Sequence, residues 1–203
     1  MLFRSLGPLD VMINNAGIMP IGPLLDEPHA TARRILEVNV LGVLVGTKVA
    51  LRHLLPRGGG HVVNVASIAG TAPVPGGVTY AASKAAVISA TESARVEFAD
   101  SGVSFTCVLP SFTATELIAG TTGTRFVRTA QPQDVARAAL DGVARRRPDA
   151  YVPAVLGPLA LLQTVLPRVL RDRMNRALGA DRAFLDIDKD ARRAYVERVD
   201  AGE

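Results

Sequence analysis

Three short apolar segments, each followed by a stretch with helical periodicity, most constrain what this 203-residue chain can fold into. They cover residues 9–13, 61–66 and 103–109. Each has the length and the apolar content of a strand that is buried in a parallel sheet. Residues 28–55 and 79–99 between them carry apolar side chains at the spacing of helices. This alternation predicts an α/β fold with a parallel sheet and right-handed crossovers.

The second half of the chain continues this alternation less regularly. Residues 131–146 predict a further helix that begins near a proline, and residues 150–153 predict a short last strand. Residues 111–130 are rich in threonine and glycine, which is typical of a loop over a substrate site. Residues 154–203 predict a C-terminal helical extension, and we expect its charged end, 181–203, to be peripheral. No repeat or linker divides the chain, which predicts a single domain with about four strands and flanking helices.

Charge and cysteine content limit the partners of the chain. The formal net charge is +4, and the arginines at 145–147 and 168–176 are not interleaved with aromatic residues. They indicate solvated helix faces and no nucleic-acid site. Residues 157–178 favour a helical cap or subunit contact over the alternative of a helix on a membrane surface. The single cysteine, Cys107, predicts a buried structural thiol. The first eight residues do not have the pattern of a signal peptide, so we expect a reducing, cytoplasmic location. No set of His, Cys and carboxylate residues has the spacing of metal ligands.

Three side chains that can exchange protons or donate hydrogen bonds fall in one short stretch. Ser67 follows the apolar segment 61–66, which places its hydroxyl at the carboxyl end of a strand, where open α/β sheets bind ligands. Tyr80 and Lys84 are one helical turn apart and therefore share a helix face. Because a nearby ammonium favours the phenolate, Lys84 is predicted to lower the pKa of Tyr80 from about 10. Tyr80 is then a candidate acid/base.

Four features occur in a fixed order along the first two thirds of the chain. Asn14-Asn-Ala-Gly17 follows a strand, Asn39 lies in the next helix, Ser67 follows the next strand, and Tyr80-x-x-x-Lys84 begins the helix after it. Together they resemble the classical short-chain dehydrogenase/reductase family, over about residues 9–153. The resemblance implies a Rossmann-like, doubly wound parallel sheet, of which this chain contains the C-terminal part. It also implies an NAD(P)-dependent oxidoreductase that interconverts a secondary alcohol and a ketone by hydride transfer.

The resemblance assigns a role to each matching residue. Tyr80 is the acid/base, and Lys84 lowers its pKa and holds the nicotinamide ribose. Ser67 hydrogen-bonds the substrate oxygen, and Asn39 anchors a water molecule in a proton relay. Further cofactor-binding positions lie in the loops after two strands: Asn15, Ala16, Gly17, Pro110, Thr113 and Thr115. Pro110 and Thr115 match the family pattern, whereas Ser111 and Thr113 depart from it.

The implied partners are small molecules and further copies of the chain. The cofactor is NAD or NADP, and the substrate is a small lipophilic alcohol or ketone, because Phe112, Leu117 and Ile118 follow the third strand. Members of the family commonly form homo-oligomers through two long helices, here near residues 30–55 and 79–99.

The nucleotide-binding half of the family is not found in this sequence. Its Gly-rich turn leads from a strand into a helix that meets the pyrophosphate, whereas glycines 58–60 lead from a helix into a strand. We expect the strand at 9–13 to lie at an exposed apolar edge. We also expect the chain to be the C-terminal portion of a longer enzyme. The alternative is a natural short form that cannot bind cofactor alone, either a non-catalytic remnant or a partner subunit.

Overall fold

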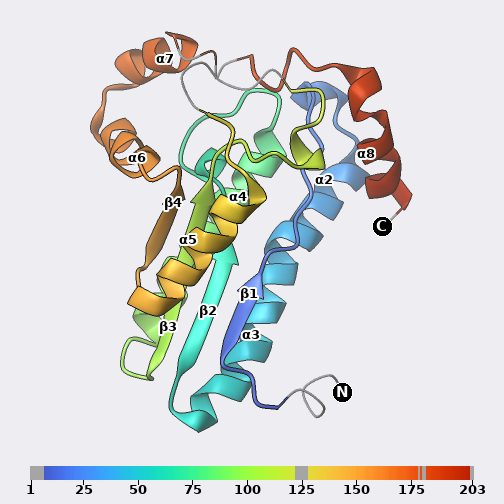
Figure 1. Cartoon of the computed structure of the whole chain (residues 1–203). Helices are drawn as coiled ribbons and strands as arrows, with labels where there is room; N and C mark the ends of the chain where they lie inside the picture. The colour runs from blue at the N-terminus through green and yellow to red at the C-terminus, as the bar shows by residue number, and fades with distance from the viewer. Residues whose placement is uncertain (1–6, 122–127, 178, 180–181, 202–203) are drawn as a thin grey trace.

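The computed structural model describes residues 7–121, 128–177, 179 and 182–201, which form a parallel sheet with helices on both faces (Figure 1). The strands of this part of the chain are β1 (Val11–Asn14), β2 (Gly60–Val65), β3 (Val103–Pro110) and β4 (Asp149–Val152). They lie in sequence order, and each neighbouring pair is parallel. The predicted Rossmann-like α/β fold, with about four strands, is confirmed.

Helices connect consecutive strands, as the apolar periodicity predicts. The main crossovers are α2 (His29–Leu36) and α3 (Gly42–Leu54) between β1 and β2, α4 (Val78–Glu97) between β2 and β3, and α5 (Pro132–Arg145) between β3 and β4. The C-terminal part contributes α6 (Leu156–Val165), α7 (Arg168–Ala177) and α8 (Lys189–Ala201). Single 3-10 turns are η1 (Leu24–Asp26), η3 (Leu55–Arg57), η4 (Ile68–Gly70) and η5 (Glu116–Ile118).

The first crossover departs from a regular helix at one point. Residues Glu37–Leu41 form a π-helical turn, η2, between α2 and α3. Such turns often occur at functional sites, because they redirect side chains that a regular helix would place elsewhere. Asn39 lies within this turn and is fully buried.

The core has one layer on each face of the sheet. On one face, α3 packs against Val62 of β2 and Phe105 of β3. On the opposite face, α5 packs against the neighbouring residues Val63 and Val108. Successive side chains of a strand point to opposite faces, so a strand covered on both sides is apolar throughout. Each fully buried valine of this kind contributes about 1.5–3 kcal/mol to stability.

The edge strand β1 exposes apolar side chains. Within the described residues β1 pairs with β2 alone, and Val11 and Ile13 remain 37% and 45% exposed. The exposed apolar edge that the sequence predicts is therefore confirmed. Such an edge is a ready surface for pairing with another strand.

The charged tail is not peripheral, and that prediction is wrong. Helix α8 buries Arg192 and Tyr195, and the Tyr195 hydroxyl accepts a hydrogen bond from the backbone N–H of Met19 at 2.6 Å. Arg192 donates to the carbonyl oxygens of Leu117 and Ala119, at 2.9 Å each, and to that of Met19. The high charge of the tail conceals these inward-facing side chains, which lie one helical turn apart.

Cys107 is 3% exposed and forms no disulfide, as predicted for a structural thiol. Burial raises its pKa to about 12, which keeps it protonated and unreactive at neutral pH. Among the residues that the structure describes, no helix is long and apolar enough to cross a membrane.

Candidate active site

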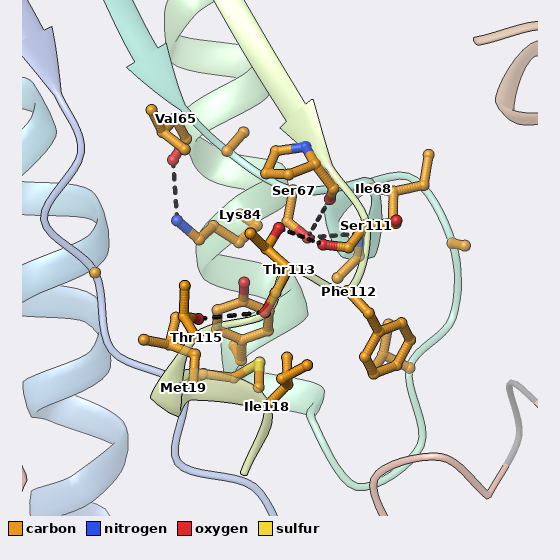
Figure 2. A pocket seen from close by; sticks show the side chains of 18 of the residues that line it. Met19, Val65, Ser67, Ile68, Lys84, Ser111, Phe112, Thr113, Thr115 and Ile118 are labelled. Carbon is orange, nitrogen blue, oxygen red and sulfur yellow. Dashed lines mark hydrogen bonds between the residues drawn. The ribbon is translucent and has the colours of Figure 1, made fainter. Parts of the chain in front are cut away.

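Ser67 lies just beyond the carboxyl end of β2 and is held by backbone groups. Its backbone is extended, with φ −171° and ψ 155°, and its side chain begins the turn η4. The hydroxyl Oγ accepts a hydrogen bond from Ala69 N at 3.1 Å and donates to Pro110 O at 3.3 Å (Figure 2). The bond to Pro110 O is long for a hydroxyl donor, so the hydroxyl can readily redirect this hydrogen bond to a better acceptor. Ser67 is thus positioned at the sheet edge with a hydroxyl that can donate.

Helix α4 brings Tyr80 and Lys84 to the same edge. The two residues are 6% and 5% exposed, and the Lys84 Nζ lies 5.8 Å from the centre of the Tyr80 ring. Figure 2 shows Lys84 extending toward the end of β2, where Nζ donates to Val65 O at 3.0 Å. The four-residue spacing on one helix therefore does place both groups on one face, beside Ser67.

The pKa of Tyr80 shifts in the direction opposite to the prediction from sequence. Burial raises the pKa of Tyr80 to about 12, against the lowering effect of a hydrogen bond with the Ser67 side chain. Tyr195 adds to the increase, and Lys84 is not among the causes. Burial also lowers the pKa of Lys84 to about 8, because the same enclosure that disfavours a phenolate disfavours an ammonium. The sequence shows the spacing of the two groups but not this desolvation.

Asn39 connects three parts of the site. Its Oδ1 accepts from Ile18 N at 2.8 Å, and its Nδ2 donates to Ile18 O at 2.9 Å and to Ser83 Oγ at 3.0 Å. Both amide protons are therefore used within the protein, and one lone pair of Oδ1 remains to accept a further hydrogen bond. Asn39 is not among the residues that line the cavity described below, and it supports the site from behind.

Gly17 separates Asn39 from Lys84. A Cβ atom at Gly17 would lie 3.3 Å from Lys84 Nζ and 3.4 Å from Asn39 Oδ1, closer than most side chains allow. The glycine thus keeps a space open between an ammonium and an amide oxygen. This is the place where the sequence predicts a bound water molecule and close approach of the cofactor.

All of the predicted site residues except Asn39 line one cavity of about 530 Å³, a usual size for a small-molecule site. They are Asn15, Ala16, Gly17, Ser67, Tyr80, Lys84, Pro110, Thr113 and Thr115. The lining also includes Ser111, whose Oγ has no hydrogen-bond partner in the described part of the chain. Residues 122–127 of the predicted substrate loop 111–130 lie outside the described residues.

The sequence did not indicate the part of the cavity wall that the C-terminal extension contributes. Helix α6 contributes Leu156 and Gln163, α7 contributes Asn175, and the segment before α8 contributes Phe184. The Phe184 ring stacks on Phe112, with 5.3 Å between ring centres. One signal was available, namely lone amide residues within otherwise apolar or basic helices. Residues 7–121, 128–177, 179 and 182–201 contain no group of three or more His, Cys, Asp or Glu that could hold a metal ion.

A serine, a tyrosine and a lysine are gathered at the carboxyl edge of the parallel sheet, where Rossmann-like α/β proteins bind their ligands. A family model described as "short chain dehydrogenase" matches residues 2–125. The chain belongs to the short-chain dehydrogenase family, as the motifs predict.

Several known proteins are similar to this chain over part of their own length. A cis-4-hydroxycyclohexanecarboxylate dehydrogenase of Sinomonas cyclohexanicum is 39% identical over 142 residues, which cover 65% of this chain and 57% of that protein. A probable oxidoreductase EphD of Mycobacterium tuberculosis is 33% identical over 186 residues, which cover 81% of this chain and 31% of that protein. The crystal structure of the acetoin dehydrogenase YohF from Salmonella typhimurium matches with a TM-score of 0.67 at 25% identity, over 74% of this chain and 66% of that chain. This chain thus spans from about a third to about two thirds of the length of these proteins.

Proposed function

We propose that the protein is an NAD(P)-dependent oxidoreductase that interconverts a secondary alcohol and a ketone, with Tyr80 as acid/base. The observation that carries this proposal is the convergence of Ser67, Tyr80 and Lys84 on one largely apolar cavity. A substrate oxygen in that cavity needs a hydrogen-bond donor and a proton source as its charge changes. Ser67 and Tyr80 supply these two functions from neighbouring elements.

The residues at the sheet edge fit a dinucleotide cofactor. The space beside Lys84 Nζ is open because Gly17 has no side chain, and a side chain there would fill it. Part of a ligand can therefore enter this space and approach the protein backbone closely. Asn15, Ala16 and Gly17 would contact the adenosine side, Lys84 the nicotinamide ribose, and Pro110, Thr113 and Thr115 the carboxamide. When bound, NAD or NADP supplies or accepts the hydride.

Tyr80 is suited to donate a proton at neutral pH. With its pKa raised to about 12, the side chain is a phenol, the form that protonates a carbonyl oxygen during ketone reduction. In the opposite direction Tyr80 must first lose its own proton, and the phenolate then takes the proton of the alcohol. Lys84, with its pKa near 8, is mostly an ammonium at pH 7 and favours that transfer.

Ser67 and Asn39 support the transfer without themselves exchanging the reacting proton. Ser67 moves its donated hydrogen bond from Pro110 O to the substrate oxygen, which is easy because the present bond is 3.3 Å long. Asn39 Oδ1 and Lys84 Nζ both border the space that a side chain at Gly17 would fill, and Asn39 Oδ1 would accept a hydrogen bond from a water molecule bound there. That water returns protons to Tyr80 from solvent.

The proposal extends to substrate, assembly and location. Apolar side chains that line the cavity, such as Phe112 and Ile118, favour a small lipophilic alcohol or ketone as the substrate. Leu36, Leu41 and Val45 on the first crossover are 45%, 55% and 51% exposed, which supports a homo-oligomer that buries them. A cytoplasmic location belongs to the same proposal, because the single cysteine is a buried thiol.

Cofactor binding and turnover test the proposal on this chain. Titration with NADH and with NADPH should raise its melting temperature, because a ligand that binds the folded state stabilises it. Tyr80→Phe keeps the ring and removes the hydroxyl, so turnover of a lipophilic ketone should fall by about 10²–10⁴-fold with cofactor binding intact. Turnover that survives in Tyr80→Phe contradicts the assigned role of the hydroxyl.

The second candidate is a non-catalytic chain that keeps the fold and associates with other proteins. The exposed apolar side chains Val11 and Ile13 on the edge strand β1 favour it, because they offer a surface for another chain. No thermal response to either dinucleotide, together with formation of a complex with a full-length relative, would support this candidate and exclude independent catalysis.

A further inference from the structure

Two buried amide side chains in the C-terminal helices have no role in the proposed reaction. Gln163 of α6 and Asn175 of α7 are each 8% exposed, and both line the cavity that contains Tyr80. Gln163 Nε2 donates to Asn175 Oδ1 at 3.4 Å, which is a long hydrogen bond. Gln163 Oε1 is buried and has no hydrogen-bond partner in the described part of the chain. Since buried polar atoms are nearly always hydrogen-bonded, this oxygen indicates a missing partner.

Both helices bury these amides while they leave apolar side chains in solvent. In α7 the buried residue is Asn175, whereas Val169 and Leu170 are 63% and 48% exposed. In α6 Gln163 is buried beside Leu156 and Ala160, whereas Val165 is 73% exposed. A helix that only fills a core turns its apolar side chains inward, and departures from that rule are expected at functional sites. Helix α7 therefore presents a polar group to the cavity in place of its apolar side chains, and α6 presents one beside two apolar residues.

The rest of the wall selects for a neutral, lipophilic ligand. The stacked rings of Phe112 and Phe184 form part of it, together with aliphatic side chains of the same cluster. Lys84 is the one charged side chain among the described lining residues, and it already donates to Val65 O. A charged group on the substrate would lose its hydration against this apolar part of the wall without gaining a cation besides Lys84, which is unfavourable.

We propose that Gln163 and Asn175 bind a second hydroxyl group of the substrate, so that the preferred substrate is a neutral, lipophilic diol or hydroxyketone. A hydroxyl group can donate one hydrogen bond and also accept one. It would donate to Gln163 Oε1 and accept from an amide N–H of the same pair of side chains. This pairing holds for either orientation of the two amides, because the pair always presents an acceptor and a donor. The inference rests on the proposed function for the first, reacting group, which Ser67 and Tyr80 bind.

Matched alcohols test the inference by binding, without any need for turnover. The probes are cyclohexane-1,4-diol and 4,4′-bicyclohexyldiol, each compared with its one-hydroxyl partner, cyclohexanol and 4-cyclohexylcyclohexanol. The two lengths cover a near and a distant placement of the second hydroxyl. Isothermal titration or ligand-detected NMR with the 203-residue chain should show one diol binding about tenfold more tightly than its partner, the effect of one added hydrogen bond.

Variants assign that preference to the amide pair. Gln163→Leu should reduce the preference for the diol over its one-hydroxyl partner to less than about twofold. The double variant Gln163→Leu with Asn175→Leu replaces both partners by apolar groups of similar size, which folded proteins tolerate well, and serves if the single variant does not fold. Gln133→Leu, at an exposed glutamine of α5, is the matched control and should keep the preference.

The outcomes separate this inference from the proposed function. If neither diol binds better than its partner, or if the double variant keeps the preference, the inference is wrong. If diols bind preferentially but none of the four alcohols is oxidised with NAD or NADP, the hydroxyl site at Gln163 and Asn175 stands, and the proposed function fails together with the assignment of the diol as a substrate. If each diol is oxidised with the same kcat/KM as its one-hydroxyl partner, the function stands and the inference fails.

Discussion

Replacing Arg192 by methionine tests how helix α8 is held over the cavity. The Arg192 side chain is 2% exposed and donates to the carbonyl oxygens of Leu117, Ala119 and Met19. Leu117 and Met19 line the cavity from two separate segments, so this one side chain ties α8 to both. Burial lowers the pKa of Arg192, which means that the enclosure disfavours its charge and the hydrogen bonds offset that cost.

The expected loss of stability follows from the balance of two opposing effects. A hydrogen bond to a charged group contributes about 1.5–3 kcal/mol, and two of these bonds have a normal length of 2.9 Å. The variant recovers the desolvation free energy of the guanidinium but leaves carbonyl groups without donors. A buried acceptor that loses its donor costs about 1–3 kcal/mol. We expect Arg192→Met, which removes the donor of several carbonyl groups but recovers the desolvation cost, to lower the free energy of unfolding by about 3 kcal/mol.

Urea denaturation followed by circular dichroism measures this change. Arg193→Met is the matched control, because the neighbouring side chain is 69% exposed and pairs with Asp190 at the surface. Such a pair contributes less than about 1 kcal/mol. Arg192→Lys keeps the charge but not the planar fork, so its loss should be intermediate. If Arg192→Met and Arg193→Met unfold at the same urea concentration, the buried hydrogen bonds do not hold α8 and the reasoning is wrong.

Two further predictions concern helix α4. Lys84→Met should stabilise the chain by about 3 kcal/mol at pH 7, because the ammonium is buried at a cost. Since the folded pKa, about 8, is below the ordinary 10.5, the unfolded chain binds more protons between these values. Wild-type stability should therefore rise relative to Lys84→Met from pH 8 to 10.5, and a constant difference in urea titrations across this range would contradict the buried charge. Gly70→Ala should lower stability by about 1–3 kcal/mol and reduce turnover, because its Cβ would lie 2.7 Å from Lys84 C and Ala85 N, which are backbone atoms and cannot yield locally. Gly42→Ala is its control, since that Cβ would lie 3.7 Å from Glu37 O, and thermal unfolding should show no loss.

Local pattern was enough to predict the framework and the elements that carry the site. Apolar segments such as 61–66 formed the parallel strands, because a strand buried on both faces needs apolar side chains throughout. The spacing of Tyr80 and Lys84 placed them on one face of α4, because helical geometry fixes which residues are neighbours. Ser67 lies beyond the end of β2 for the same kind of reason, since the strand and the turn are both local features.

Only the tertiary structure decided how these groups are enclosed. The direction of the Tyr80 pKa depends on burial against distant segments that contain Met19 and Phe184, and on the electrostatic effect of Tyr195 in α8, and no local spacing contains that information. The same holds for Gln163 and Asn175, whose inward orientation follows from how α6 and α7 pack against the cavity. Sequence by itself determined the secondary structure and the reactive residues, because those depend on neighbours along the chain. Desolvation and cavity shape depend on neighbours in space, and the fold alone brings those together.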